Sequence, residues 1–340
     1  MEGALYKQLE DGKIQCNACS RNCVISEGNA GFCGVRKNKK QKLDLIVYGK
    51  PCSACVDPVE KKPLFHFLPG SFAYSLGTYG CNFSCDFCQN YDISQAPKDH
   101  SERFERMLKN LEDFPPKKIV DYAMRENCRS IAYTYNEPTI FSEYAYDIGM
   151  IAKKEGLKNI YVTNGYQTKE CWDYVSEFLD AANIDLKGDD TFYKKLCGNA
   201  REEPVKESIK YAKKLGMWVE VTTLLIKDEN DDVDFLKKTA EFIYSIDPEM
   251  PWHITAFYPC YKMRNKQPTS LEMMIKARII GEEVGLQNVY CGNVISKYEN
   301  TNCPKCKKTV IERWGFNITK NNVVSGKCGY CGKRISGVFE

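Results

Sequence analysis

Three cysteines in a short stretch carry the most specific chemical signal in the sequence. Cys81, Cys85 and Cys88 follow the spacing C-x3-C-x2-C, and Phe87 stands directly before the last of them. Three thiolates that hold a four-iron cluster leave one iron without a protein ligand, open to an amine and a carboxylate. The alternative is half of a zinc site, which a fourth ligand would close. We interpret these three residues, the cysteine triplet, as ligands of a [4Fe-4S] cluster.

The residues before the triplet support this interpretation. An apolar stretch at 72–79 predicts a strand that ends just before Cys81. Gly80 follows this strand, and a glycine permits the sharp turn that a cluster-binding loop needs. The sequence therefore predicts that the triplet lies in a loop at the end of a strand.

Strand-like and helix-like segments alternate along the middle of the chain. The predicted strands are 72–79, 129–135, 159–163, 182–186, 217–226 and 252–257, and the predicted helices are 117–126, 139–154, 168–180, 203–215, 231–245 and 270–283. Six strands with crossover helices predict an α/β fold with a parallel sheet, a partial (β/α)6 barrel. A further strand-like piece follows at 287–290.

Polar residues occur where several of these strands end. Enzymes with parallel barrels place their chemistry at the carboxyl ends of the strands, so these residues are candidates for the site. They are Asn136 and Glu137, Thr163 and Asn164, and Asp185 and Lys187. Each pair could instead form a turn that opens the following helix.

Two other ionisable residues of the strands are expected to be structural. Glu220 lies inside the fifth predicted strand, where a buried carboxylate needs a partner. His253 starts the sixth strand, at the end opposite to the expected chemistry.

Two further groups of four cysteines lie toward the ends of the chain. Cys303, Cys306, Cys328 and Cys331 form two C-x2-C knuckles, which predict a tetrahedral zinc site of the ribbon type, or an iron site of the rubredoxin type. Cys16, Cys19, Cys23 and Cys33 predict a second metal site, which could hold zinc or a second cluster, and the alternative is that they are free thiols. Cys52 and Cys55 receive no role.

Composition and charge limit the other classes of function. The chain has 340 residues, 43% of them hydrophobic, and a formal net charge of +3 with acidic and basic residues intermixed, so nucleic acid is not an indicated partner. No apolar run approaches the length of a membrane span, and the first residues do not form a signal peptide, so we expect a cytoplasmic protein. We divide it into a cysteine-rich module with a connector (1–70), a barrel (71–296) and a metal-binding ribbon (297–340).

The order of the motifs resembles one family of enzymes. Thr78-Tyr-Gly-Cys-Asn-Phe-Ser-Cys-Asp-Phe-Cys-Gln-Asn90, Tyr135-Asn-Glu-Pro-Thr139, Val162-Thr-Asn-Gly165, Asp185-Leu-Lys187 and the flanking cysteine motifs resemble the radical S-adenosylmethionine (SAM) enzymes. Within them the chain is similar to the enzymes associated with Memo-like and AMMECR1-like proteins, which are pyruvate formate-lyase activating enzyme-like.

The resemblance implies a reaction and a set of site residues. SAM would bind the open iron of a [4Fe-4S] cluster, and one electron would cleave it to a 5′-deoxyadenosyl radical that abstracts hydrogen from a protein or peptide. Asp185 and Lys187 would be catalytic. The implied contacts to the cofactor are Tyr79, Phe87, Asn136, Glu137, Thr163 and Asn164. The family usually has Gly-Gly-Glu-Pro where this chain has Tyr135-Asn-Glu-Pro138.

The resemblance also implies partners and conditions. They are an electron donor such as ferredoxin or flavodoxin, Memo-like and AMMECR1-like proteins, and an anaerobic setting. Two other functions stay open at this point, a non-catalytic iron–sulfur protein for electron transfer or scaffolding, and a radical SAM enzyme that modifies RNA.

Overall fold

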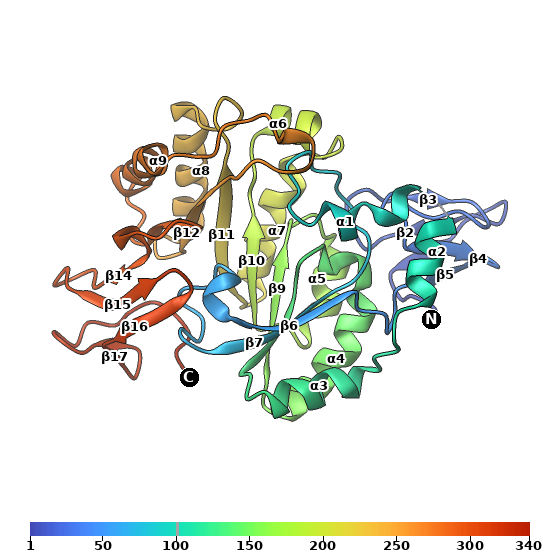
Figure 1. Ribbon diagram of the computed structural model, residues 1–340, viewed down its shortest axis with the longest axis horizontal. Coiled ribbons are helices and arrows are strands. Elements are labelled where there is room, and N and C mark those ends of the chain that lie inside the picture. The colour runs from blue at the N-terminus through green and yellow to red at the C-terminus, as the bar shows by residue number, and fades with distance from the viewer. Residues whose placement is uncertain (100–101) are drawn as a thin grey trace.

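The computed structural model describes residues 1–99 and 102–340 and has one large sheet at its centre (Figure 1). The strands of this sheet are β6 (Ser53–Pro58), β7 (Phe72–Gly77), β8 (Ser130–Tyr133), β9 (Lys158–Thr163), β10 (Ala181–Asp185), β11 (Trp218–Leu225), β12 (Trp252–Ala256) and β13 (Val289–Gly292). Their spatial order is β13-β12-β11-β10-β9-β8-β7-β6. Strands β7 to β13 are parallel, so all of their carboxyl ends lie at one edge of the sheet.

Helices connect the parallel strands. They are α3 (Pro116–Arg125), α4 (Ser142–Lys154), α5 (Lys169–Ser176), α6 (Asp190–Leu196), α7 (Glu203–Lys214), α8 (Val233–Ile246) and α9 (Leu271–Val284), and two further helices, α1 (Tyr91–Ser94) and α2 (Glu102–Lys109), follow the triplet. The side chains of Thr168, Asp189, Asp232 and Ser270 accept a backbone N–H in the first turn of their helices. These caps fix where α5, α6, α8 and α9 begin.

The predicted α/β fold with a parallel sheet is confirmed, and the strand count is corrected. All six predicted strands are present, but Val289–Gly292 pairs with β12 as a seventh parallel strand, so the predicted (β/α)6 pattern was one strand short. This strand has only four residues, and its place is decided by pairing, which the sequence does not display. Strand β6 adds an antiparallel edge, and its last three residues belong to the segment 56–70, which was predicted to be an extended connector. No pairing between β6 and β13 closes the sheet in the described part of the chain.

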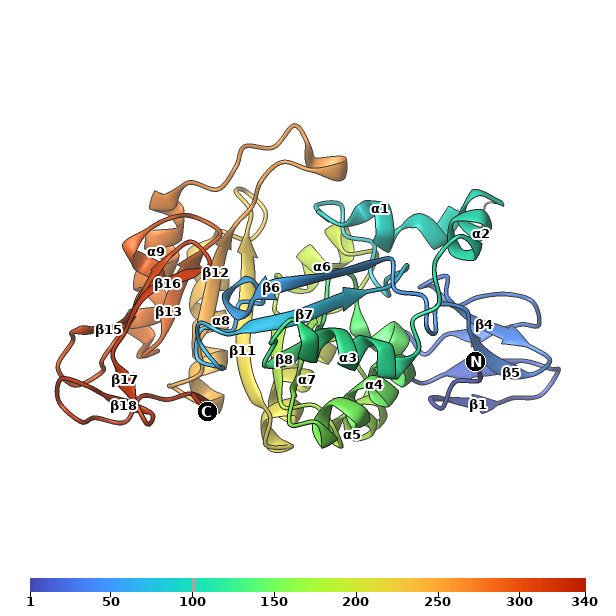
Figure 2. The same cartoon turned by 60° about the horizontal axis from the view of Figure 1, so that its bottom comes forward.

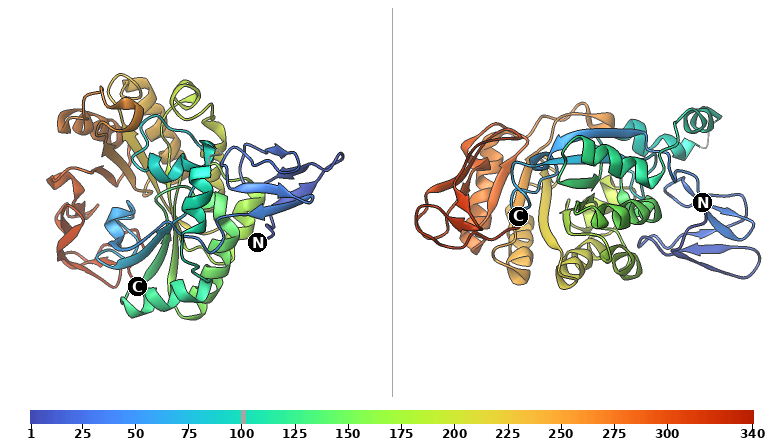
Figure 3. Two further views of the ribbon diagram at one scale, coloured as in Figure 1. Left: turned by 45° about the vertical axis from the view of Figure 1, so that its right-hand side comes forward. Right: turned by 90° about the horizontal axis from the view of Figure 1, so that it is seen from below.

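Small antiparallel elements lie at both ends of the large sheet. The N-terminal ones are β1 (Tyr6–Gln8), β2 (Ile14–Cys16), β3 (Val24–Ile25), β4 (Arg36–Lys39) and β5 (Lys42–Leu45), and the C-terminal ones are β14 (Thr301–Asn302), β15 (Thr309–Trp314), β16 (Asn317–Asn321), β17 (Val323–Val324) and β18 (Lys327–Cys328). Figures 2 and 3 place the two groups on opposite sides of the molecule. The limits 1–70, 71–296 and 297–340 stay predictions.

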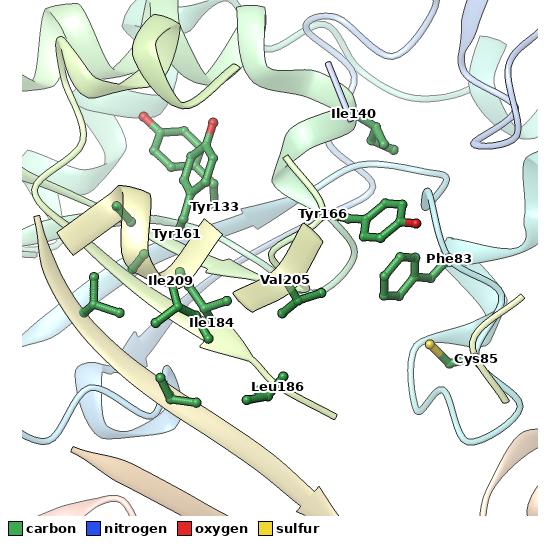
Figure 4. Packing of buried hydrophobic residues seen from close by; sticks show 14 of the residues in the cluster. Phe83, Cys85, Tyr133, Ile140, Tyr161, Tyr166, Ile184, Leu186, Val205 and Ile209 are labelled. Carbon is green, nitrogen blue, oxygen red and sulfur yellow. The ribbon is translucent and has the colours of Figure 1, made fainter. Parts of the chain in front are cut away.

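Aromatic packing supports the strands that carry the site. Tyr133 of β8 and Tyr161 of β9 are fully buried, with ring centroids 5.5 Å apart (Figure 4). Nearer the cysteine triplet, Phe83 meets Tyr166 edge to face at 5.0 Å. Such edge-to-face contacts help to hold the loops at the strand ends in place. No helix of the described chain is long and apolar enough to cross a membrane.

Candidate active site

A cavity of about 610 Å³ lies at the carboxyl ends of the parallel strands. Cys81, Cys85 and Cys88 line it, together with residues from the ends of β8, β9, β10, β11, β12 and β13. Cavities of this size commonly enclose a cofactor or a small ligand. The structure therefore brings the cysteine triplet to the same space as the polar strand ends.

The triplet fits a cluster with one open iron. Among the described residues that line the cavity there is no fourth cysteine, so three thiolates are available. Burial and the nearby charge of Glu137 raise the pKa of Cys81, so its thiolate form needs a compensating positive charge such as iron. The backbone N–H of Phe83 donates to Cys81 Sγ at 3.3 Å, and Cys88 Sγ lies 3.3 Å from Ser94 Oγ. These contacts suit thiolates that bind metal.

Glu137 ties the ends of β8 and β9 together. Its Oε1 accepts from the backbone N–H and hydroxyl of Thr139 and from the Thr163 hydroxyl at 2.7 Å. Its Oε2 accepts the backbone N–H of Asn164 at 2.8 Å. Burial raises the pKa of this carboxyl, although these hydrogen bonds oppose the shift. Both oxygens are used inside the protein, so the contact of Glu137 with the amine of SAM stays a prediction.

Asn164 continues this connection to the triplet. Its side-chain N–H donates to Asn82 Oδ1 at 2.7 Å, and the same nitrogen lies 4.0 Å from Cys81 Sγ. The sequence did not indicate Asn82, because its role depends on a contact between residues 82 positions apart. Glu137, Asn164 and Asn82 thus form a chain of contacts from β8 to the cluster loop.

The residues that replace the usual glycine pair also hold the cluster loop. Tyr135 has a left-handed backbone with φ of 69°, a conformation in which glycine is the ordinary choice. Its hydroxyl donates to Asp57 at 2.7 Å, and its carbonyl accepts from Asn90. Asn136 donates to the carbonyl of Gly80 at 2.9 Å and accepts the N–H of Thr78. The turn is therefore kept without glycine by anchoring the side chains on both sides.

Asp185 and Lys187 line the cavity as an ion pair. Lys187 Nζ lies 2.5 Å from Asp185 Oδ2. Burial disfavours the charge of Lys187, yet Asp185 and Cys85 outweigh burial and raise its pKa, so it stays positive. The expected helix-opening turn also exists, but it is made by Asp189, which caps α6. In this segment Asp185 and Lys187 therefore line the cavity, and a different residue, Asp189, forms the turn that opens the helix.

Of the remaining residues that were predicted to contact the cofactor, all but one line the cavity. Phe87, Asn136, Thr163 and Asn164 line the cavity. Tyr79 is not among the described residues that line it, since its ring is buried edge-on against Phe104, with centroids 5.6 Å apart. A side chain beside a predicted cluster loop can point either way, and packing decides which.

Glu220 has the partners that were expected of it. It accepts from His253 at 2.6 Å, from the backbone N–H groups of Phe65 and His66, and from the Trp218 ring. Burial raises its pKa, but His253 and the other donors lower it further. His253 is thus structural in its contacts, although it also lines the cavity. Sequence reasoning missed this position because it assumed that the cavity stopped at the strand ends.

The sulfur atoms of the four C-terminal cysteines lie close together. Cys303 and Cys331 have sulfurs 3.6 Å apart, and Cys306 and Cys328 have sulfurs 3.8 Å apart. A tetrahedral ion with metal–sulfur bonds of about 2.3 Å sets its sulfurs about 3.8 Å apart. This C-terminal quartet can therefore hold a single metal ion, and its ligands suit zinc and iron alike. The four N-terminal cysteines line a separate small cavity.

Comparisons with known proteins identify one matching superfamily, two proteins of similar sequence and a solved structure that matches part of the chain. Residues 75–239 match the profile of the radical SAM superfamily. An uncharacterized protein of Methanocaldococcus jannaschii is 44% identical over 338 residues, which cover 98% of this chain and 98% of that protein. A second protein of that organism, provisionally named a glycyl-radical enzyme activating enzyme, is 27% identical and covers 70% of this chain and 85% of its own length. The crystal structure of a domain of a pyruvate-formate lyase-activating enzyme from Bacteroides vulgatus is 23% identical, with a TM-score of 0.43, and covers 48% of this chain and 99% of that chain.

Proposed function

The chain belongs to the radical SAM superfamily, and we propose that it uses SAM to abstract a hydrogen atom from a protein or peptide. The observation that carries the proposal is the shared cavity, where three cysteines and the polar ends of six other parallel strands meet. When bound at the triplet, a [4Fe-4S] cluster supplies the electron that cleaves SAM to a 5′-deoxyadenosyl radical. The residues of the chain bind SAM and the substrate, orient them, and enclose them in the cavity.

The methionine end of SAM would lie between the triplet and the ends of β8 and β9. Asn136 and the segment that Glu137 fixes present backbone groups there, and Thr163 and Asn164 extend the same wall. Phe87 supplies an apolar surface beside Cys88. A fixed wall of this kind places the target hydrogen before the reactive carbon forms and keeps water away.

Asp185 and Lys187 are proposed as the charged residues nearest the reacting carbon. Their pair stands at the end of β10, in the same cavity as the triplet. Lys187 keeps its proton, so the pair offers one positive and one negative group without a change in net charge. Such a pair can hold the amide groups of a peptide in a single orientation.

A polypeptide substrate is proposed for two reasons. The cavity extends from the triplet to Lys61 of the connector and Phe316 of the C-terminal ribbon, so parts distant in sequence form its border. The provisional name of the second archaeal relative is that of an enzyme acting on another protein. Ferredoxin or flavodoxin as electron donor, and Memo-like and AMMECR1-like proteins as partners, belong to the same proposal, as do a cytoplasmic location and an anaerobic setting.

The test uses reconstituted enzyme, SAM and a strong reductant under argon. We expect 5′-deoxyadenosine formation to rise on addition of a partner protein, and to fall at least tenfold in Asp185→Ala and Lys187→Ala with the cluster retained. Lys195→Ala is the matched control, because Lys195 is an exposed lysine paired with Glu229. Full turnover in both variants, or equal stimulation by a small metabolite alone, would refute the proposal.

A further inference from the structure

The four cysteines of the N-terminal module surround a cavity that the proposed function does not use. Cys16, Cys19, Cys23 and Cys33, here called the N-terminal quartet, line a space of about 20 Å³ together with Arg36 and Asn82. This space admits about one water molecule. The four residues come from three separate turns and strands, so their meeting is a property of the fold.

The spacing of the N-terminal quartet differs from that of a single-ion site. In the described chain, only the C-terminal quartet is gathered closely enough to hold one ion. Around a zinc ion the four sulfurs nearly touch and leave no space for water between them. The N-terminal quartet keeps such a space, as the cysteine triplet does. A cluster spreads its ligands in this way, because each thiolate binds a different iron.

The cavity of about 20 Å³ that the four cysteines help to line is smaller than the volume available to iron bonded to their sulfurs. Metal–thiolate bonds are about 2.3 Å long, well inside the distance at which a water molecule rests on sulfur. Iron atoms therefore occupy the layer next to each sulfur that water cannot enter. The small open centre is consistent with a cluster that fills both that layer and the centre.

Hydrogen-bond donors are already aimed at two of these sulfurs. The Nε–H of Arg36 donates to Cys16 Sγ at 3.2 Å, and the backbone N–H of Phe32 donates to Cys23 Sγ at 3.5 Å. Arg36 is 2% exposed and is fixed by two 2.8 Å hydrogen bonds to Glu143. Donors held in place beside the sulfurs of a cluster stabilise its negative charge and set its potential.

We propose that the N-terminal quartet holds a second [4Fe-4S] cluster, in which each cysteine binds one iron. Because no iron is left open, this cluster does not bind SAM. The inference stands on the cysteines, the cavity and the donors, and it does not depend on the substrate of the enzyme.

The second cluster would lie directly beside the first. A side chain at Gly80 would come within 2.7 Å of the carbonyl oxygen of Cys33, so the two cysteine loops are in backbone contact. Asn82, the residue after Cys81, lines the cavity of the N-terminal quartet. Arg21 joins the loops further, because it donates to the carbonyl of Asn82 and, at 2.8 Å, to that of Gly198.

The test is metal content and EPR spectroscopy of the full-length protein after anaerobic reconstitution. Two clusters predict about eight iron atoms per chain beside the single metal of the ribbon. The variant with Cys81, Cys85 and Cys88 all changed to alanine should keep about half of this iron and give a reduced EPR signal that SAM leaves unchanged. The variant Cys19→Ala with Cys23→Ala should lose the other half and keep the signal that responds to SAM.

Cys128→Ala is the matched control, because Cys128 is a buried cysteine outside all three groups, and it should keep all of the iron. A wild-type protein with only about four cluster irons, or with a second zinc in place of the second cluster, would overturn the proposal. If Cys19→Ala with Cys23→Ala does not fold, the iron of the triplet variant decides the question alone. A failure of SAM cleavage would leave these iron counts unchanged, so the two proposals are tested separately.

Discussion

At the scale of single residues, Glu137 shows how the site depends on a buried carboxylate that is fully bonded within the protein. It fixes Thr163 and Asn164, and Asn164 in turn contacts Asn82 in the cluster loop. The structure therefore gives Glu137 a positioning role, whatever further contact it makes with SAM.

Changing Glu137 to Gln should weaken SAM binding and leave the cluster in place. In the variant, the side-chain NH₂ group of the glutamine faces one of the two backbone N–H groups that donate to Glu137, those of Thr139 and Asn164. The hydrogen bond lost there costs about 1–3 kcal/mol. We expect the dissociation constant of SAM, followed by EPR titration, to rise on the order of tenfold. Glu177→Gln, which changes an exposed glutamate bonded to Tyr146, should bind SAM normally. Equal SAM affinity in Glu137→Gln would contradict the positioning role.

Glu299 makes stability depend on pH. It lines the cavity, and burial raises its pKa to about 7. The folded protein holds this proton above the pH at which the unfolded chain releases it, so stability should fall as pH rises from about 4.5 to about 7.

Glu299→Gln should remove this part of the pH dependence. Above pH 7 the variant should be more stable than the wild type by up to about 3 kcal/mol, since the pKa rises from 4.5 to about 7 and one pKa unit corresponds to about 1.4 kcal/mol. Urea unfolding of both proteins at pH 5 and pH 8 measures the difference. Parallel pH profiles for the two proteins would show that Glu299 is ionised normally.

At the scale of elements, the sequence predicted what local patterns determine. The strands β7 to β12 and the helices α3, α4, α5, α7 and α8 follow from periodicity and capping residues, and the triplet was placed correctly at the end of β7. The segments that form α1, α2 and α6 were not predicted as helices. The features that the sequence did not predict depend on contacts between segments that are far apart in the chain. Strand β6 joins the sheet by pairing with β7, Asn82 meets Asn164, and the ring of Tyr79 turns toward Phe104.

The N-terminal module is fastened to α4 by a buried ion pair. Arg36 forms two hydrogen bonds to Glu143, and Glu143 also accepts the backbone N–H of Ala4. With both side chains almost fully buried, removal of one partner leaves an uncompensated charge.

Arg36→Met should therefore destabilise the protein by about 3–5 kcal/mol. The double variant Arg36→Met with Glu143→Gln should recover part of this loss, because the amide carries no charge and still accepts from Ala4. Denaturant unfolding of the full-length chain, monitored by tryptophan fluorescence, measures both. A double variant as unstable as Arg36→Met would show that the lost packing of Arg36, and not the charge of Glu143, is responsible.

At the scale of the whole molecule, the C-terminal ribbon contributes Phe316 to the border of the cavity and carries four cysteines that can hold a metal ion. Among the described residues of the ribbon, the buried hydrophobic cluster has five members, two of them cysteines of the C-terminal quartet, and we expect so small a core to need a metal to stay folded. Arg313 binds the ribbon to the connector by donating to the carbonyl of Phe65 at 2.7 Å. Val338 pairs with the backbone of His66 and Leu68.

Removal of the metal should thus loosen more than the ribbon. In Cys306→Ser with Cys331→Ser, we expect faster hydrogen exchange over residues 300–340 and also over 60–68, while β8 to β11 stay protected. Cys291→Ala, which removes a buried cysteine outside the ribbon, is the control. Unchanged exchange in the ribbon would show that the four cysteines do not hold a structural metal.

The central claim is that Cys81, Cys85 and Cys88 hold a cluster whose open iron binds SAM. The most direct measurement is the EPR spectrum of the anaerobically reconstituted, reduced enzyme before and after SAM is added. We expect the signal of this cluster to shift with SAM in the wild-type protein, and the shifting signal to be missing when all three cysteines are alanine. A spectrum that SAM leaves unchanged in the wild-type protein, with its full iron content, would contradict the claim.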